Sequence, residues 1–269
     1  MPVQAVFGEG RPGGECLRLN TGFRRRAARR GIKADPRGPS GSHGLGDAAK
    51  RAFDVVLAAL LLVLAGPLIL VLAAAIKLES RGPVLFRGRR VGLHGREFQI
   101  AKFRKMYDGA RGPALTANDD GRFTRMGRFL ARTKLDEIPQ LWNVLRGDMS
   151  LVGPRPEDPS FVEPRREDFG PVLSVRPGIT GLAQLAFARE SEILDDDDRR
   201  GDYVRRILPQ KLHLDRVYVE RRSLGLDVRI LLWTAAAVLL RRDVAVNRAN
   251  GRLSRRRRAA RQLQPLPLD

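Results

Sequence analysis

The sequence has little of what several common protein classes need. A single cysteine, Cys16, can form neither a disulfide within the chain nor a cysteine-based zinc site. The three histidines, His43, His94 and His213, are too scattered along the chain to suggest a metal cluster. Aromatic residues make up only 6%, and no groove-reading or base-stacking motif accompanies them. These shortages exclude a disulfide-stapled secreted fold and disfavour a nucleic-acid-binding domain.

Several signature motifs are missing as well. The sequence contains no P-loop, no zinc-protease motif and no nucleophile elbow. Residues 8–13 have the letters of the dinucleotide fingerprint G-x-G-x-x-G. Pro12 and Gly14, however, break the place where its helix should open, so we discard the match.

What the sequence has in excess is positive charge. The 269 residues include 50 Lys and Arg against 30 Asp and Glu, a net charge of +20, which indicates anionic partners. Much of this charge lies in residues 1–47 and 248–269, which are rich in Gly, Pro and Arg and lack hydrophobic periodicity. We predict that both segments are disordered basic arms. They are either solvated tails or tethers to an anionic lipid surface.

Residues 55–76 form an uncharged, almost wholly apolar run. As a helix it would be about 33 Å long, enough for the roughly 30 Å hydrocarbon core of a bilayer. Basic residues flank both ends, which favours the cytoplasmic side for both. Gly66 and Pro67 at the midpoint can bend or break the helix. We therefore predict a re-entrant helix-break-helix, with an ordinary transmembrane helix as the alternative.

Two further stretches are typical of helices lying in a membrane interface. One is a predicted helix over residues 122–133, with an apolar face and a basic face (Phe123, Met126, Phe129 and Leu130 against Arg122, Arg125, Arg128 and Arg132). The other, residues 230–240, is apolar but too short to span a bilayer. For each, a surface helix packed on the core of a soluble protein remains an equal alternative.

The remaining pattern predicts an α fold with minor β structure that is monotopic in the membrane. Residues 83–86 and 96–100 read as a small β-hairpin with a turn at 92–95. Further helices are expected over 139–146, near 200–220 and over 227–241.

Two adjacent carboxylates, Asp136 and Glu137, stand immediately before a predicted helix. Peptide dipoles there favour the ionised form, which can bind Mg²⁺ or act as a nucleophile, although an acidic residue in this place is often only a cap. The basic residues nearby favour a catalytic or metal-binding role over that of a cap (Lys102, Arg104, Arg132 and Arg155). Arg155 stands between two prolines, so it loses little entropy on binding phosphate. The set is typical of phosphoryl transfer.

Several motifs together resemble the bacterial sugar transferase family, the monotopic phosphoglycosyl transferases that prime glycan assembly on a polyprenyl phosphate. The resemblance covers about residues 48–245, and we place the catalytic domain at 48–247. Its most specific part is the unbroken run over residues 135–156. The other matching segments are Lys50-Arg51-x-x-Asp54, the Gly66-Pro67 break, residues 82–86, residues 102–106 and residues 176–181.

The resemblance implies transfer of a sugar-1-phosphate from a nucleotide sugar, usually a UDP-sugar, to polyprenyl phosphate, with release of UMP. Asp136 matches the nucleophile that forms a covalent phosphosugar intermediate. Glu137 matches its partner, associated with the required Mg²⁺ and with activating the acceptor, so both carboxylates are candidate metal ligands. Arg155, Lys102 and Arg104 match the phosphate-binding basic residues. The resemblance also implies exopolysaccharide or glycan synthesis at the cytoplasmic membrane, with the site on the cytoplasmic face.

The chain departs from the family pattern at Ala131, where Arg is common, and at Lys134 and Gly88, where Ser and Gln are usual. Two other readings stay open, the first because of the arginine-rich terminal segments and the second because of Ala131. One is a membrane-tethered basic protein that binds nucleic acid, although we expect no nucleic-acid partner. The other is a non-catalytic scaffold that has kept the fold.

Overall fold

A computed structural model describes residues 43–110, 112, 120–188, 198–240 and 244–255. These residues form a mostly helical structure with a minor β component, as predicted. A helix begins at His43 and a strand ends at Arg255, so residues 43–47 and 248–255 of the predicted basic arms are among the described residues. The rest of both arms, residues 1–42 and 256–269, lies outside the described residues.

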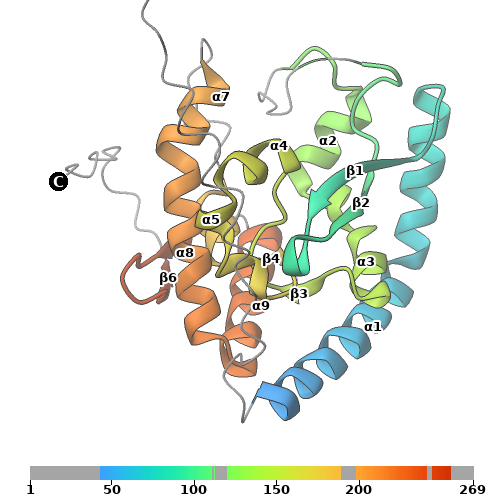
Figure 1. Ribbon diagram of the computed structural model, residues 1–269. Coiled ribbons are helices and arrows are strands. Elements are labelled where there is room, and N and C mark those ends of the chain that lie inside the picture. Colours follow the sequence, from blue (N-terminus) through green and yellow to red (C-terminus); the bar gives the residue numbers. More distant parts are fainter. Residues whose placement is uncertain (1–42, 111, 113–119, 189–197, 241–243, 256–269) are drawn as a thin grey trace, which may run out of the picture. The chain divides into compact units, whose positions relative to one another are not determined.

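The apolar run forms most of helix α1 (His43–Glu79), which continues through Pro67. The predicted break is therefore a bend within one helix, which Figure 1 shows partway along α1. Proline causes such bends because it lacks a backbone donor and clashes with the preceding turn. Only 11% of the most apolar window of α1 is buried. A helix so apolar and so exposed is compatible with membrane association.

The first residues of α1 are held by a buried polar network. Lys50 Nζ lies 2.7 Å from Asp227 Oδ2 and 3.7 Å from Asp54 Oδ2. Asp54 accepts hydrogen bonds from Ser150 Oγ at 2.7 Å and from the Leu151 backbone at 3.2 Å. The Lys-Arg-x-x-Asp motif therefore attaches the start of α1 to strand β3 (Ser150–Val152) and helix α9 (Leu224–Leu239).

The far half of α1 packs on the elements that carry the predicted site. Leu72 and Ile76 share a small core with Phe103 of strand β2 (Glu97–Phe103) and Leu130 of helix α2 (Arg125–Thr133). Strand β1 (Leu85–Val91) pairs with β2 in antiparallel register. The predicted hairpin is confirmed, and its strands extend further than the sequence pattern indicated.

Helix α2 differs from its prediction in where it begins and in the width of its apolar face. It begins at Arg125, after an N-cap at Thr124, and Phe129 is 49% exposed beside its exposed arginines. Leu130 alone of the helix's large apolar side chains is fully buried. The apolar face is therefore narrower than expected, because Phe123 packs ahead of the helix and Phe129 faces outward. Contact of this face with a bilayer stays a prediction.

A second pairing brings two distant loops together. Strand β3 pairs in parallel with β4 (Gly178–Thr180), so residues 153–156 lie against residues 176–181. A Cβ on Gly153 would lie 2.6 Å from the Arg176 carbonyl oxygen, so only glycine fits this approach.

The remaining elements surround this pair and complete the core. They are η3 (Leu93–Gly95), η4 (Leu135–Glu137), α3 (Gln140–Arg146), α4 (Pro159–Val162), η5 (Glu163–Arg165), α5 (Arg166–Phe169), η6 (Val172–Ser174), α6 (Leu182–Ala186), α7 (Arg199–Asp202), the π-helical η8 (Tyr203–Ile207), α8 (Leu208–Arg221), and the hairpin β5 (Val244–Val246) and β6 (Leu253–Arg255).

Candidate active site

The two adjacent carboxylates lie on η4, a single turn between α2 and α3. Lys134 enters this turn with φ of +61°, a left-handed conformation that is rare for a side chain larger than glycine or asparagine. Asp136 is 1% exposed, whereas Glu137 is only partly buried. The turn therefore aims the two side chains into different surroundings, and α3 begins only at Gln140, after Pro139.

Strand β2 is attached to α3 through one buried amide. Asn143 Oδ1 accepts a hydrogen bond from the Ala101 backbone at 2.9 Å, and Asn143 Nδ2 donates to the Gln99 carbonyl at 2.8 Å. These two hydrogen bonds fix the next residue of β2, Lys102, beside η4. Lys102 Nζ lies 2.8 Å from Glu137 Oε1. Figure 1 shows β2 beside α3, where these contacts form.

Asp136 forms an ion pair with a different lysine, Lys105. Lys105 Nζ lies 3.0 Å from Asp136 Oδ2. The Lys105 backbone is held against α2, because its carbonyl accepts from Thr124 N at 3.0 Å and Gly127 leaves no room for a Cβ beside it. Lys105 was not among the predicted site residues. The sequence feature that could have identified Lys105 is its position in the Lys-Phe-Arg-Lys segment, three residues after Lys102 and just beyond the end of β2.

Arg155 reaches the same turn from the loop that follows β3. Its Nη2 lies 3.7 Å from Glu137 Oε1. Burial opposes ionisation of Glu137, but the positive charges of Lys102 and Arg155 outweigh it and hold the pKa of Glu137 well below its usual value. Burial in turn lowers the pKa of Lys102. Glu137 is therefore ionised at neutral pH.

Two predicted phosphate ligands lie elsewhere. Arg104 is buried, and its guanidinium donates to the Ser80 carbonyl at 2.8 Å, to Ser80 Oγ at 2.9 Å and to the Arg81 carbonyl. It therefore fixes the chain after α1 rather than facing the carboxylates. Arg132 is exposed in the last turn of α2. No hydrogen bond or ion pair in the described part of the chain joins Arg132 to Asp136 or Glu137.

Two buried polar atoms in the site are left without a hydrogen-bond partner among the described residues. They are Asp136 Oδ1 and Gln140 Nε2. Leaving such groups unpaired costs about 1–3 kcal/mol each, so their pairing is expected to come from a ligand. Gln140, one helical turn after Asp136, was not predicted, although it belongs to the unbroken run over 135–156.

The carboxylate pair is compatible with Mg²⁺. No group of three or more metal-binding side chains occurs in the residues that the structure describes. Mg²⁺ does not require one, because it commonly binds one or two carboxylates together with substrate phosphates and water. The unpaired Asp136 Oδ1 and the Glu137 carboxylate fit that role.

Removing the Lys102 charge is expected to shift the pH dependence of the site. In Lys102→Met, the partly buried Glu137 loses its nearest cation, so its pKa rises. Glu137 then takes up a proton at a higher pH than in the wild type, and the acid side of the kcat/KM profile moves to higher pH. A pH–rate profile measures this shift, with Lys77→Met, an exposed lysine outside the site, as control. An unchanged acid side would contradict the role assigned to Lys102.

Residues 45–241 match the model of the family described as Bacterial sugar transferase. The chain is 43% identical to UDP-glucose:undecaprenyl-phosphate glucose-1-phosphate transferase from Caulobacter vibrioides, over 72% of this chain and 70% of that protein.

Two longer proteins are also similar. Identity is 40% to undecaprenyl-phosphate glucose phosphotransferase from Komagataeibacter xylinus, over 72% of this chain and 36% of that protein. Identity is 39% to UDP-N-acetylgalactosamine-undecaprenyl-phosphate N-acetylgalactosaminephosphotransferase from Aeromonas hydrophila, over 71% of this chain and 43% of that protein. The chain thus spans less than half the length of these two relatives.

Proposed function

Because the chain belongs to the bacterial sugar transferase family, we propose that it transfers a sugar-1-phosphate from a UDP-sugar to a polyprenyl phosphate and releases UMP. One observation carries the proposal: two carboxylates on a single turn face three cations, Lys102, Lys105 and Arg155. A site with this excess of positive charge suits a diphosphate, and a carboxylate within it can attack phosphorus.

In the first step that we propose, a carboxylate oxygen of Asp136 bonds to the β-phosphorus of the UDP-sugar. The bond between that phosphorus and the oxygen bridging to the α-phosphate breaks, and UMP leaves with the electron pair. Lys105 holds the attacking carboxylate in one orientation, and Arg155 faces the negative charge on the phosphate oxygens. The product is a covalent aspartyl-phosphosugar.

In the second step, an oxygen of polyprenyl phosphate attacks the same phosphorus. The bond to Asp136 breaks, and the carboxylate is regenerated. Glu137, kept ionised by Lys102 and Arg155, is placed to orient the acceptor phosphate or take up its proton. Mg²⁺ bound at Asp136 or Glu137 would neutralise phosphate charge.

The position of α1 suggests where this chemistry occurs. The apolar acceptor carries its phosphate at the membrane surface, and the nucleotide sugar is soluble, so the site must lie at the surface where both are present. Basic residues at both ends of the bent helix favour one face for both ends. We therefore propose that α1 is re-entrant and that the site faces the cytoplasm. The basic arms would add attraction to anionic lipids.

Pro67→Ala is expected to change this topology. Alanine restores the missing donor and removes the clash, so α1 should straighten and place its C-terminal end across the bilayer in a measurable fraction of molecules. Labelling of single cysteines introduced near residues 47 and 79 with a membrane-impermeant reagent measures this, in a Cys16→Ser background. Leu68→Ala is the matched control. Equal labelling of the wild type and the Pro67 variant would show that the proline does not set the topology.

The reaction itself is tested by a panel of UDP-sugars with polyprenyl phosphate and Mg²⁺, read as UMP release. One or more sugars should give UMP in amounts that depend on the acceptor. No UMP from any sugar, with salt-sensitive DNA binding by the purified protein, would favour a membrane-tethered nucleic-acid binder. No activity and no DNA binding would favour a scaffold.

A further inference from the structure

A buried polar cluster lies directly behind the loop that carries Arg155. Tyr203 Oη donates a hydrogen bond to Glu157 Oε1 at 2.8 Å and accepts one from Lys211 Nζ at 3.2 Å. Lys211 Nζ is also 3.8 Å from Glu157 Oε1. Tyr203, Lys211 and Asp215 are all less than 5% exposed. None of these side chains takes part in the reaction steps above.

The backbone is held on both sides of Arg155, and the cluster supplies the contacts at Arg155 and after it. The Asp215 carboxyl accepts a hydrogen bond from the Arg155 backbone N–H. Two residues later, the Glu157 side chain is held by Tyr203, and its carbonyl accepts from Val91 N at 3.1 Å. On the other side, the Pro154 carbonyl accepts from Gly178 N at 2.8 Å. The Arg155 side chain leaves this fixed backbone toward Glu137.

The helix that carries the cluster is irregular at the point where the cluster begins. Tyr203 and Lys211 are eight residues apart, which on a regular helix with 3.6 residues per turn is about 80° more than two full turns. The chain is π-helical over Tyr203–Ile207. A π turn accommodates one extra residue, so the eight residues make about two full turns and both side chains point to Glu157. The irregular turn is therefore what assembles the cluster.

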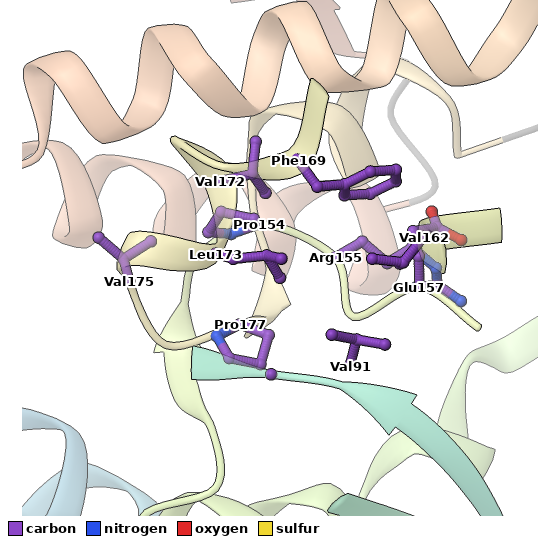
Figure 2. Close-up of a pocket in the computed structure, with 11 residues that line it drawn as sticks. Val91, Pro154, Arg155, Glu157, Val162, Phe169, Val172, Leu173, Val175 and Pro177 are labelled. Carbon is purple, nitrogen blue, oxygen red and sulfur yellow. The ribbon is translucent and has the colours of Figure 1, made fainter. Parts of the chain in front are cut away.

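The opposite side of the loop is apolar and closely packed. Pro154, Val172, Leu173 and Pro177, which Figure 2 shows as sticks, are among the residues that line a cavity of about 10 Å³. This is the size of about one water molecule, too small for a sugar or a nucleotide. The cavity on this apolar side of the loop is therefore no second substrate site.

Burial and the nearby Glu157 carboxylate raise the pKa of Asp215 well above its usual value, which favours its neutral form. Buried polar groups cost stability unless they are fully paired, and apolar residues of similar volume would stabilise the core as well or better. Stability alone therefore does not account for four such residues behind one loop.

We propose that Glu157, Tyr203, Lys211 and Asp215 are positioning residues, which fix the loop backbone so that the Arg155 guanidinium meets the substrate phosphate. This inference rests on the proposed transfer reaction. A misplacement of about 1 Å at such a contact can reduce the rate up to 100-fold, so loosening the loop should reduce catalysis through Arg155 alone.

A double-mutant cycle tests this link. Tyr203→Phe, which removes one hydroxyl, should lower kcat/KM for the UDP-sugar about tenfold. In the Arg155→Ala background, the same change should lower it less than twofold, because the residue that it positions is gone. Tyr218→Phe is the control. It removes a different buried hydroxyl, on α8, which donates to Asp227 and Val152, and its effect should be equal in both backgrounds.

A second measurement does not depend on activity. Amide hydrogen exchange at Arg155 should be at least about tenfold faster in Asp215→Leu, which loses the acceptor, and near wild-type in Asp215→Asn, which keeps an oxygen there. Equal Tyr203→Phe effects in both backgrounds, or unchanged exchange in Asp215→Leu, would overturn the proposal. An inactive wild-type protein would instead refute the proposed reaction, while the exchange rates still report whether Asp215 holds the loop.

Discussion

Asp136→Asn is expected to reduce sugar-phosphate transfer by roughly 10⁴-fold or more, because an amide oxygen is a poor nucleophile and cannot form the covalent intermediate. The change preserves the size of a side chain that is 1% exposed, so the fold should survive. Turnover is measured as UMP release with donor and acceptor present. Asp168→Asn, which alters an exposed carboxylate far along the chain, is the matched control and should retain full activity.

The same variant has a second, direct measurement. Wild-type protein mixed with the UDP-sugar alone should release about one UMP per molecule and gain the mass of one phosphosugar. Asp136→Asn should show neither, while its membrane association is unchanged because α1 is intact. Retention of more than about a tenth of the activity, or an adduct on another residue, would remove Asp136 as the nucleophile.

Lys50→Met is expected to cost about 3–5 kcal/mol of the free energy of unfolding. The Lys50 ammonium is the cation between two nearly inaccessible carboxylates, Asp54 and Asp227. Its removal takes the ion-pair partner from both carboxylates while they stay buried, which is more costly than losing the ion pair itself. The melting temperature in detergent should fall by about 10 °C or more.

Two variants make this prediction specific. Lys50→Met combined with Asp227→Asn removes one of the stranded charges and should recover part of the loss. Lys77→Met removes an exposed lysine at the other end of α1 and should change stability by less than about 0.5 kcal/mol. If the single Lys50 variant lost less than about 1 kcal/mol, the network would not be what attaches α1.

Local patterns in the sequence were sufficient for much of the fold. The hairpin of β1 and β2, the helix after Pro139 and the two C-terminal helices follow from periodicity, glycine turns and proline placement. A bend within α1 is what a proline inside a helix predicts. The exposed position of Phe129 does not follow, because its place depends on how α2 packs on α1 and β2, which no local pattern records.

The site was predictable in composition but not in geometry. Sequence reasoning brought together Asp136, Glu137, Lys102 and Arg155, which the structure places around one turn. It also included Arg104, whose guanidinium binds the carbonyls after α1, and missed Lys105. The two residues lie side by side at the end of β2, so only the tertiary structure decides which one faces the carboxylates.

Leu72 and Ile76 of α1 pack on Phe103 and Leu130, so the exposed apolar helix also supports the strand that carries Lys102. A truncated form lacking α1, made to obtain a water-soluble protein, would expose Phe103 and Leu130 to solvent. It would also remove the packing that holds the end of β2, next to Lys102 and Lys105. Preparation of an active protein should therefore retain the whole helix and supply a detergent or nanodisc around it.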